Sequence, residues 1–179
     1  LGIGRDVPPE AVRERRAAAT AAGGKGEPDG TSERTAEPER KPRPYHAVRQ
    51  AFTEKELAYW KEYGITEEVL ERYGAVSLKE YRSETAEGKA FGFTSTAAEP
   101  MYGYMGKWGV KVYRPVSDIR FVYGGHTGEG YCFGLEQLPP KGDTLFLTGG
   151  EKDVLTLAAH GFHAICFNSE TSVIPVRII

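Results

Sequence analysis

Thr144-Leu-Phe-Leu-Thr148 leads directly into Gly149-Gly-Glu-Lys-Asp153 and then into Val154-Leu-Thr-Leu-Ala-Ala159. The first run has the length and the residues of a strand, and the last run spaces its apolar residues for a helix. The sequence therefore predicts a strand, a turn at the two glycines, and a helix with an acidic first turn. In open parallel sheets, functional groups gather at this carboxyl end of the strands.

The two acidic residues of the predicted turn, Glu151 and Asp153, indicate what this site could bind. They would repel a phosphate group unless a divalent cation lay between, and the chain lacks the Lys-Ser/Thr and the longer glycine-spaced cradle of a phosphate-binding loop. Two hard oxygen ligands suit Mg²⁺. On local chemistry alone a purely structural role is favoured, because acidic side chains in a first helical turn oppose the helix macrodipole.

Three segments together resemble the opening of a Toprim domain: Phe133-Gly-Leu-Glu-Gln-Leu-Pro139, Leu145–Val154 and His160-Gly-Phe-His-Ala-Ile-Cys-Phe-Asn168. This is the metal-binding catalytic domain of DnaG-type primases, twinkle-like primase-helicases, type IA and II topoisomerases and some nucleases. In that family a first strand ends in a glutamate, followed by Gly/Lys-Asp and a helix. Glu151 matches the family's invariant acidic residue.

The segments upstream are similar to primases rather than to the other Toprim proteins. Glu56–Gly74 looks like the two short helices that open the primase polymerase core. Lys111-Val-Tyr-Arg-Pro115, followed by Tyr131-Cys-Phe-Gly-Leu135, resembles the basic segment before the Toprim strand. The resemblance covers about residues 54–170. It implies an α+β primase N-terminal subdomain over 45–140 and an incomplete α/β, Rossmann-like Toprim domain over 141–179.

The resemblance implies Mg²⁺-dependent (or Mn²⁺-dependent) synthesis of RNA primers, by two-metal nucleotidyl transfer. Glu151 would bind metal or accept a proton, and Asp153 would support the site electrostatically. Lys152 would orient or balance Glu151. Gly149 and Gly150 would let the backbone turn close to the metal.

One stretch is densely basic, and the resemblance makes it a candidate contact for nucleic acid. It holds Lys107, Lys111, Arg114 and Arg120, with Asp118 as the one opposing charge. Interleaved aromatic residues could stack on unpaired bases while the cations follow phosphates. Strict strand alternation, however, puts Lys111 and Arg114 on opposite faces. Each of the four could also be an ordinary solvated surface charge.

The sequence departs from the family in one important respect. A complete Toprim domain carries a later Asp-x-Asp motif, and this sequence has none and no aspartate after Asp153. We therefore expect a fragment of a longer protein, cut at both ends and inactive alone. A non-catalytic nucleic-acid-binding or scaffold module, or a Toprim nuclease, remain as alternatives. Implied partners are single-stranded DNA, ribonucleotides and a replicative helicase, acting in trans or fused downstream.

Composition is that of a globular domain with a tail. The chain has 179 residues, of which 40% are hydrophobic and 27% charged, and a net charge of −2, so nucleic-acid contacts would need a local patch. Residues 1–44 are expected to be a disordered linker. Cys132 and Cys166 are expected to be buried, reduced thiols. No long apolar span indicates a membrane, and we expect a cytoplasmic protein of bacterial, phage or mobile-element origin.

Ordered structure is expected from Tyr45. Thr53 and Glu56 form a capping-box pattern that predicts the start of a helix, and Gly64 is expected to end that helix. Thr66 and Gly74 are expected to begin and end a second helix. The apolar residues here should form a small helical core: Phe52, Leu57, Trp60, Val69, Leu70 and Tyr73. Strand-like runs follow at 91–95, 101–105, 110–113 and 120–123, with a hairpin at Gly106-Lys-Trp-Gly109.

Overall fold

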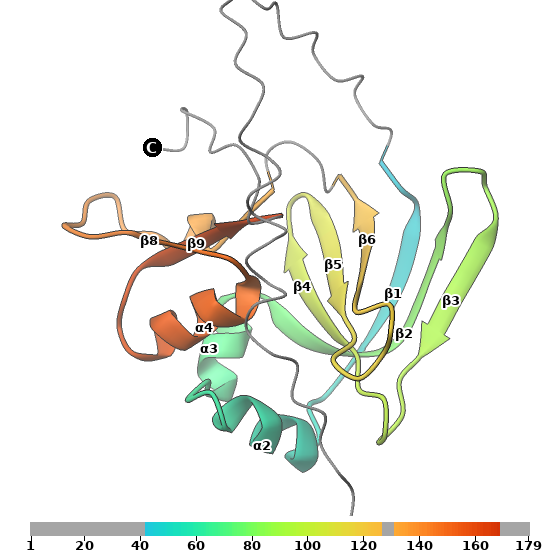
Figure 1. Cartoon of the computed structure of the whole chain (residues 1–179), viewed down its shortest axis with the longest axis horizontal. Helices are drawn as coiled ribbons and strands as arrows, with labels where there is room; N and C mark the ends of the chain where they lie inside the picture. The colour runs from blue at the N-terminus through green and yellow to red at the C-terminus, as the bar shows by residue number, and fades with distance from the viewer. Residues whose placement is uncertain (1–41, 127–130, 169–179) are drawn as a thin grey trace, which may run out of the picture. The chain divides into compact units, whose positions relative to one another are not determined.

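The structure, a computed structural model, describes residues 42–126 and 131–168 (Figure 1). All of them belong to one compact unit, residues 39–179. This unit is an α+β structure with two sheets and three α-helices among its described residues. The predicted linker lies outside the described residues except for its last three. Within the described ranges, no helix is long and apolar enough to cross a membrane.

The larger sheet is entirely antiparallel. Its strands run in the order β1 (Tyr45–Gln50), β2 (Ala75–Glu84), β4 (Tyr102–Gly106), β5 (Gly109–Tyr113) and β6 (Phe121–Gly125), and β3 (Ala90–Thr94) pairs with the far half of β2. The four predicted strand runs are confirmed as β3, β4, β5 and β6. The predicted hairpin is confirmed too, since Gly106 pairs with Gly109. β1 and β2 were not among the predicted strands.

The strand path of this sheet curls back on itself. Arg43, just before β1, exchanges two backbone hydrogen bonds with Gly125 of β6, at 2.8 and 3.1 Å. The ring of Tyr45 lies against Gly124, where a Cβ atom would come within 2.5 Å of it. Position 124 therefore requires a glycine, because the Tyr45 ring approaches the backbone there closely. Ordered structure thus begins before Tyr45.

Two short helices follow β1 as the sequence predicts. α2 (Glu54–Lys61) begins with the complete Thr53–Glu56 capping box, and α3 (Glu67–Arg72) begins at the Thr66 cap. Glu56 is itself buried and accepts a 2.8 Å hydrogen bond from the Ser77 hydroxyl of β2. The capping box therefore also fixes α2 to the sheet.

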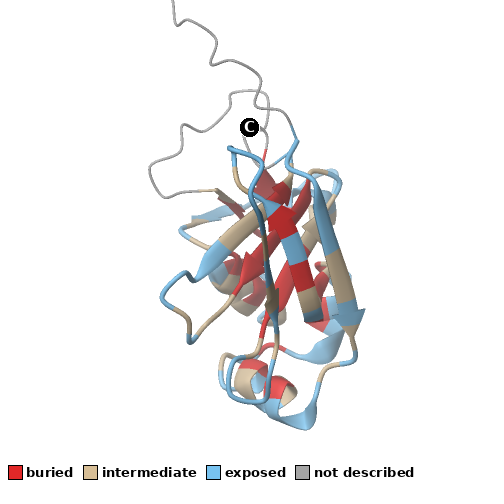
Figure 2. Cartoon of the chain, turned by 90° about the vertical axis from the view of Figure 1, so that its right-hand side faces the viewer, coloured by how far each residue is buried: buried red, intermediate tan, exposed pale blue. Residues whose placement is uncertain are grey.

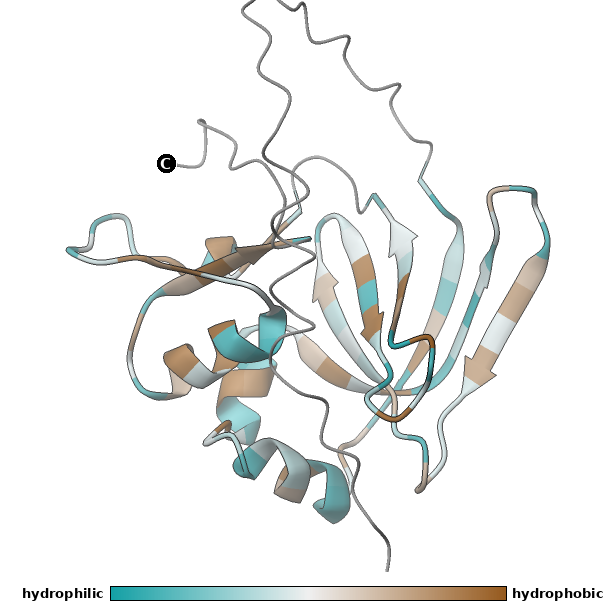
Figure 3. Ribbon diagram, in the orientation of Figure 1, coloured by the Kyte–Doolittle hydropathy of each residue, from teal (hydrophilic) through white to brown (hydrophobic). Residues whose placement is uncertain are grey.

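The smaller sheet contains the predicted strand–turn–helix. β8 (Phe146–Thr148) pairs in parallel with β9 (Ala164–Phe167), and α4 (Glu151–Ala159) connects them. β7 (Cys132–Phe133) pairs antiparallel with β9, and a 3₁₀ turn, η2 (Leu135–Gln137), follows it. Figure 3 shows β8 and β9 as largely hydrophobic and the first turn of α4 as hydrophilic.

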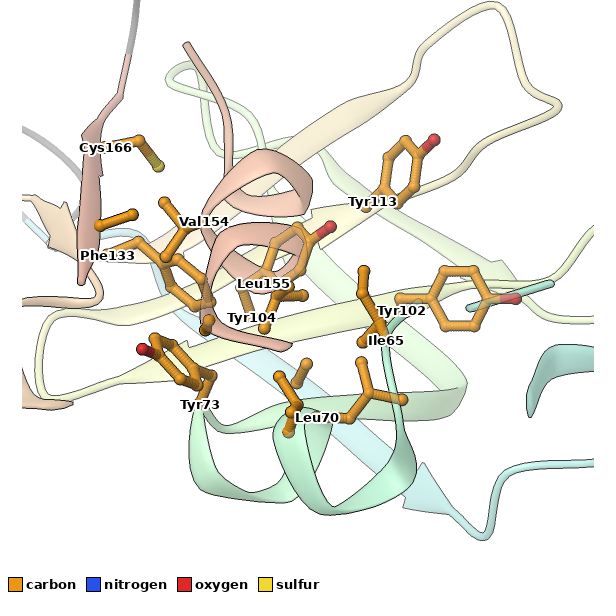
Figure 4. Close-up of a cluster of buried hydrophobic side chains, with 14 of the residues drawn as sticks. Ile65, Leu70, Tyr73, Tyr102, Tyr104, Tyr113, Phe133, Val154, Leu155 and Cys166 are labelled. Atoms are coloured by element: carbon orange, nitrogen blue, oxygen red, sulfur yellow. The ribbon is translucent and has the colours of Figure 1, made fainter. Parts of the chain in front are cut away.

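One apolar core joins the helices to both sheets. Trp60, Leu70, Tyr104, Phe133 and Leu155 belong to it, and several of its side chains are drawn in Figure 4. The expected helical-core residues all belong to this cluster or pack against it. A second cluster, with Leu78, Tyr81, Val110 and Val112, lies on the other side of the larger sheet. Buried positions, red in Figure 2, follow the strands and the inner sides of the helices.

Gly74 provides a test of how tightly α3 joins the sheet. Its φ is +65°, and a Cβ atom there would lie 2.8 Å from the Met105 carbonyl oxygen. Gly88 also has a positive φ, +79°, but faces open space. Alanine in this backbone region costs about 1–2 kcal/mol. We expect Gly74→Ala to lower the free energy of unfolding in urea by clearly more than Gly88→Ala. Equal losses would show that the Met105 contact relaxes without cost.

Candidate functional site

The acidic first turn of α4 lies directly beyond the end of β8, as predicted. Gly150 is the N-cap residue and has an extended backbone, with φ −163°. Neither Gly149 nor Gly150 has a positive φ, so no left-handed conformation requires glycine there. Glu151 is 2% exposed, whereas Asp153 is exposed. The two predicted acidic residues therefore differ sharply in environment, because they point to different sides of the helix.

Three side chains from distant segments meet at Glu151, and we call them the Glu151 cluster: Lys111, Tyr131 and Glu151. The Lys111 ammonium donates to Glu151 Oε1 at 2.6 Å, and the Tyr131 hydroxyl donates to the same oxygen at 2.5 Å. Lys111 is 5% exposed and Tyr131 2%. The cluster connects β5 of the larger sheet, the residue just before β7 and the first turn of α4.

Aromatic rings surround the Lys111 ammonium on its other sides. It lies 4.8 Å from the ring centre of Phe121, 5.4 Å from that of Tyr131 and 5.7 Å from that of Tyr123. Trp108 packs edge-on against Tyr131, with ring centres 4.3 Å apart. Ring faces attract a desolvated cation. The Lys111 ammonium thus contacts a carboxylate on one side and aromatic rings on the others.

Burial and the Glu151 charge act on the neighbouring titratable groups. Burial, then the negative charge of Glu151, raises the pKa of Tyr131 far above its usual range, so its hydroxyl stays protonated and donates. The same two causes raise the pKa values of Tyr104 and Cys166. Burial raises the pKa of the Cys132 thiol from 9.0 to about 11. The expectation that both cysteines are buried free thiols is confirmed.

The described residues in this arrangement do not form a divalent-metal site. Mg²⁺ needs several oxygen ligands in near-octahedral geometry. One oxygen of Glu151 already accepts hydrogen bonds from an ammonium and a phenol, and Asp153 faces solvent. No group of three or more His, Cys, Asp or Glu side chains in residues 42–126 and 131–168 is placed to hold a metal ion. Lys111 occupies the position beside Glu151 that a cation would take.

The four predicted basic residues do not share one surface. Lys111 is buried against Glu151, while Arg114 stacks on the Phe93 ring 3.8 Å away and donates to the Ile119 carbonyl at 3.3 Å. They lie on opposite faces, as strand alternation predicts. Arg120 is exposed and donates to the Tyr113 hydroxyl at 3.4 Å. Lys107 is exposed and pairs with Glu136 at 3.4 Å.

Lys152 does not take the balancing role that the sequence suggested. Its ammonium lies 3.8 Å from the centre of the Tyr63 ring. The cation beside Glu151 is Lys111, which comes from a strand 40 residues earlier. Adjacent helical residues point in directions roughly 100° apart. Lys152 therefore cannot face the same neighbours as Glu151.

Tyr131 and the rings around Lys111 are the residues that sequence reasoning missed as part of the site. Their spacing along the chain gives no signal, because the residues come together only through strand pairing. The pairing of β5 with β6, for example, places Lys111 opposite Tyr123. Two surface grooves lie elsewhere, one beside Tyr45 and Phe91 and the other beside Phe52. Neither is lined by Glu151. The candidate site is thus a closed polar cluster rather than an open pocket.

Removing one member of the ion pair should be costly. Lys111→Met keeps most of the side-chain stem and leaves a buried carboxylate without its counter-ion. Breaking a buried pair from one side typically costs about 3–5 kcal/mol. We expect a loss of this size in urea denaturation, and a clearly smaller loss for Lys111→Met combined with Glu151→Gln. Lys107→Met, which removes an exposed lysine, should change stability little. Additive losses in the double variant would mean that the two charges are not coupled.

The raised thiol pKa of Cys132 predicts a loss of stability at high pH. The unfolded thiol ionises near 9.0, whereas the folded one ionises near 11. Its contribution to folding is fully present below pH 9 and is lost as pH rises toward 11, because the unfolded chain then releases the proton more readily. We expect the unfolding free energy to fall across this window, and to fall less steeply in Cys132→Ala. Identical slopes would contradict the prediction.

Comparison with known proteins gives no match to this chain. No protein family, no curated protein and no solved structure matches it. The functional interpretation therefore rests on the residues of the chain and on the geometry of the Glu151 cluster.

Proposed function

We propose that this chain is part of the catalytic core of a DnaG-type or twinkle-like primase, which makes RNA primers on single-stranded DNA. One observation carries the proposal. Glu151 and Lys111 belong to two separate segments that resemble primases, and their side chains meet at 2.6 Å. A chance similarity in either segment would give no reason for the two residues to share a site.

The arrangement of elements is compatible with the finer fold that the resemblance implies. A helical and antiparallel part precedes a β8–α4–β9 unit with parallel strands, and the buried glutamate follows the first of these strands. In an α/β sheet this is where ligands bind. On this proposal the first part contacts the template and the second supplies the acidic group.

The surface beside the Glu151 cluster has the chemistry to contact a single strand. The loop from β5 to β6 exposes Arg120 together with the apolar residues Val116 and Ile119, and Phe121, the first residue of β6, is exposed next to Arg120. Cations that follow phosphates, beside rings that stack on bases, are typical of proteins that bind single strands. Since the whole chain carries a net charge of −2, binding would depend on this local patch.

The chemical property that the Glu151 cluster offers is a negative charge in a fixed position. Glu151 is held as a fixed acceptor by two donors, and its position at the first turn of α4 is favoured by the helix dipole. The Mg²⁺ dependence that the resemblance implies stays a prediction for the parent enzyme. Carboxylates beyond those of the described residues would have to complete such a site.

A second candidate, a non-catalytic nucleic-acid-binding module, is favoured by the state of Glu151. Its charge is already balanced by Lys111, and no Asp-x-Asp motif occurs in the sequence. The two proposals differ in one measurement. A primase parent incorporates ribonucleotides on single-stranded DNA in a Mg²⁺-dependent reaction that Glu151→Gln abolishes. A binding module binds the single-stranded DNA but incorporates no ribonucleotides.

Single-strand binding can be tested on this chain directly. We expect it to bind a fluorescent oligo-dT more tightly than a duplex of the same length, with affinity that falls as salt rises. Arg120→Gln should weaken binding and reduce the slope of log affinity against log salt by about one, as loss of one phosphate contact predicts. Arg72→Gln, an exposed arginine on α3, is the matched control and should leave both unchanged. Equal effects of the two variants would exclude the proposed surface.

A further inference from the structure

Lys152 is a cation in the first turn of α4 that the Glu151 cluster does not use. Its ammonium lies 3.8 Å from the centre of the Tyr63 ring, and Lys152 itself is half-buried. Tyr63 begins a row of rings that continues across α2 to the loop from β5 to β6. We call this row, with the cation at each end, the aromatic strip: Lys152, Tyr63, Tyr59, Tyr113, Phe121 and Arg120.

Each step along the aromatic strip is a direct contact. The ring centres of Tyr63 and Tyr59 lie 5.5 Å apart, and the Tyr59 and Tyr113 hydroxyl oxygens lie 3.1 Å apart. The Tyr113 ring stacks on the Phe121 ring, with centres 5.3 Å apart. Arg120 donates to the Tyr113 hydroxyl, and its guanidinium carbon lies 5.8 Å from the centre of that ring. The strip therefore joins two segments that are distant in the chain, the start of α4 and the β5–β6 loop.

The aromatic strip is exposed at its Phe121 end and half-buried along α2. Phe121 is 40% exposed and Arg120 is exposed, whereas Tyr113, at 4%, is the buried support behind them. Tyr59 and Tyr63 are half-buried. Partly exposed rings can stack on unpaired bases, and a cation at each end can contact a phosphate. The strip thus has the chemistry of a surface for single-stranded nucleic acid.

We infer that a single strand lies along the aromatic strip, from the β5–β6 loop over α2 to Lys152. The inference rests on the proposed function and extends it, because that proposal places the strand only at the β5–β6 loop. The extension brings the strand to the helical turn that carries Glu151. It also gives Lys152 a role, as a phosphate contact that the Tyr63 ring holds in place.

The charges beside the aromatic strip determine how such a strand is held. Glu62 precedes Tyr63 in the chain and Asp153 follows Lys152, and both acidic residues are exposed. Cations are therefore few on this surface, and each one that contacts a phosphate adds to the salt dependence of binding. Stacking on rings tolerates any base. We expect binding with a shallow salt dependence and no strong sequence preference.

Lys152 and Lys61 provide a matched pair of cation variants. Lys61 lies two residues after Tyr59 on α2, so its side chain points about 200° away around the helix, off the aromatic strip. Lys152→Gln should weaken binding of a fluorescent oligo-dT and lower the slope of log affinity against log salt by about one. Combined with Arg120→Gln, it should lower the slope by about two, because the two cations contact different phosphates. Lys61→Gln should change neither quantity. Equal effects of the two lysine variants would overturn the inference.

Ring substitutions test the stacking contacts. Tyr63→Leu removes the ring beside Lys152 and should weaken binding of oligo-dT on the order of tenfold at fixed salt. Phe146→Leu removes a ring of 38% exposure on β8, outside the strip, and should leave the affinity unchanged. Circular dichroism checks that both variants are folded. Equal affinities of these two variants would show that no strand passes over α2.

Cross-linking of the unsubstituted chain needs no variant to fold. Oligo-dT with 5-iodouracil in place of thymine is irradiated with the chain, and the cross-linked peptides are identified by mass spectrometry. We expect cross-links at Phe121 and also at Tyr59 or Tyr63, the rings available for stacking.

The outcomes of cross-linking separate the inference from the proposed function. Cross-links at Phe121 without any on α2 overturn the inference and leave the proposed function standing. Cross-links on α2, in a parent protein that incorporates no ribonucleotides, support the inference and reject the primase. Absence of any binding to oligo-dT rejects the strip together with the proposed template surface.

Discussion

The buried ion pair between Lys111 and Glu151 is the interaction on which the rest of the structure depends. It joins strand β5 of the larger sheet to the first turn of α4, and both charges are almost fully removed from water. Such a pair contributes little net stability, because removing two charges from water costs several kcal/mol per ion. Its effect is specificity: each charge is tolerated only where the other lies.

The surroundings of the pair follow from this constraint. Tyr131 completes the hydrogen bonding of the carboxylate, and the rings of Phe121 and Tyr123 enclose the ammonium. The apolar core that joins α2, α3 and α4 to both sheets lies around the same region, so the pair and the packing determine each other. Two donors and the surrounding packing therefore hold the Glu151 carboxylate in one position.

Much of the local structure could be predicted from the sequence. The capping box at Thr53 and Glu56, the strand–turn–helix around Glu151 and the hairpin at Gly106–Gly109 depend on neighbouring residues, and all three occur. The strands β1 and β2 were missed because their residues, such as Tyr45–Gln50, alternate poorly between apolar and polar. Their partners lie far away in the chain: Tyr45 pairs with Ser83. Strand pairing at that separation leaves no periodic signal in either segment.

The sequence by itself determined the identity of the acidic residue, Glu151, and the helix turn that carries it, because turn chemistry and helix periodicity are local properties. It also placed Lys111 and Arg114 on opposite faces, since strand alternation is local as well. Only the tertiary structure decided which cation balances Glu151. The adjacent Lys152 points to Tyr63, and the distant Lys111 reaches the carboxylate. The reason is geometric: a helix separates neighbouring side chains in direction, whereas packing of α4 against the larger sheet brings distant ones together.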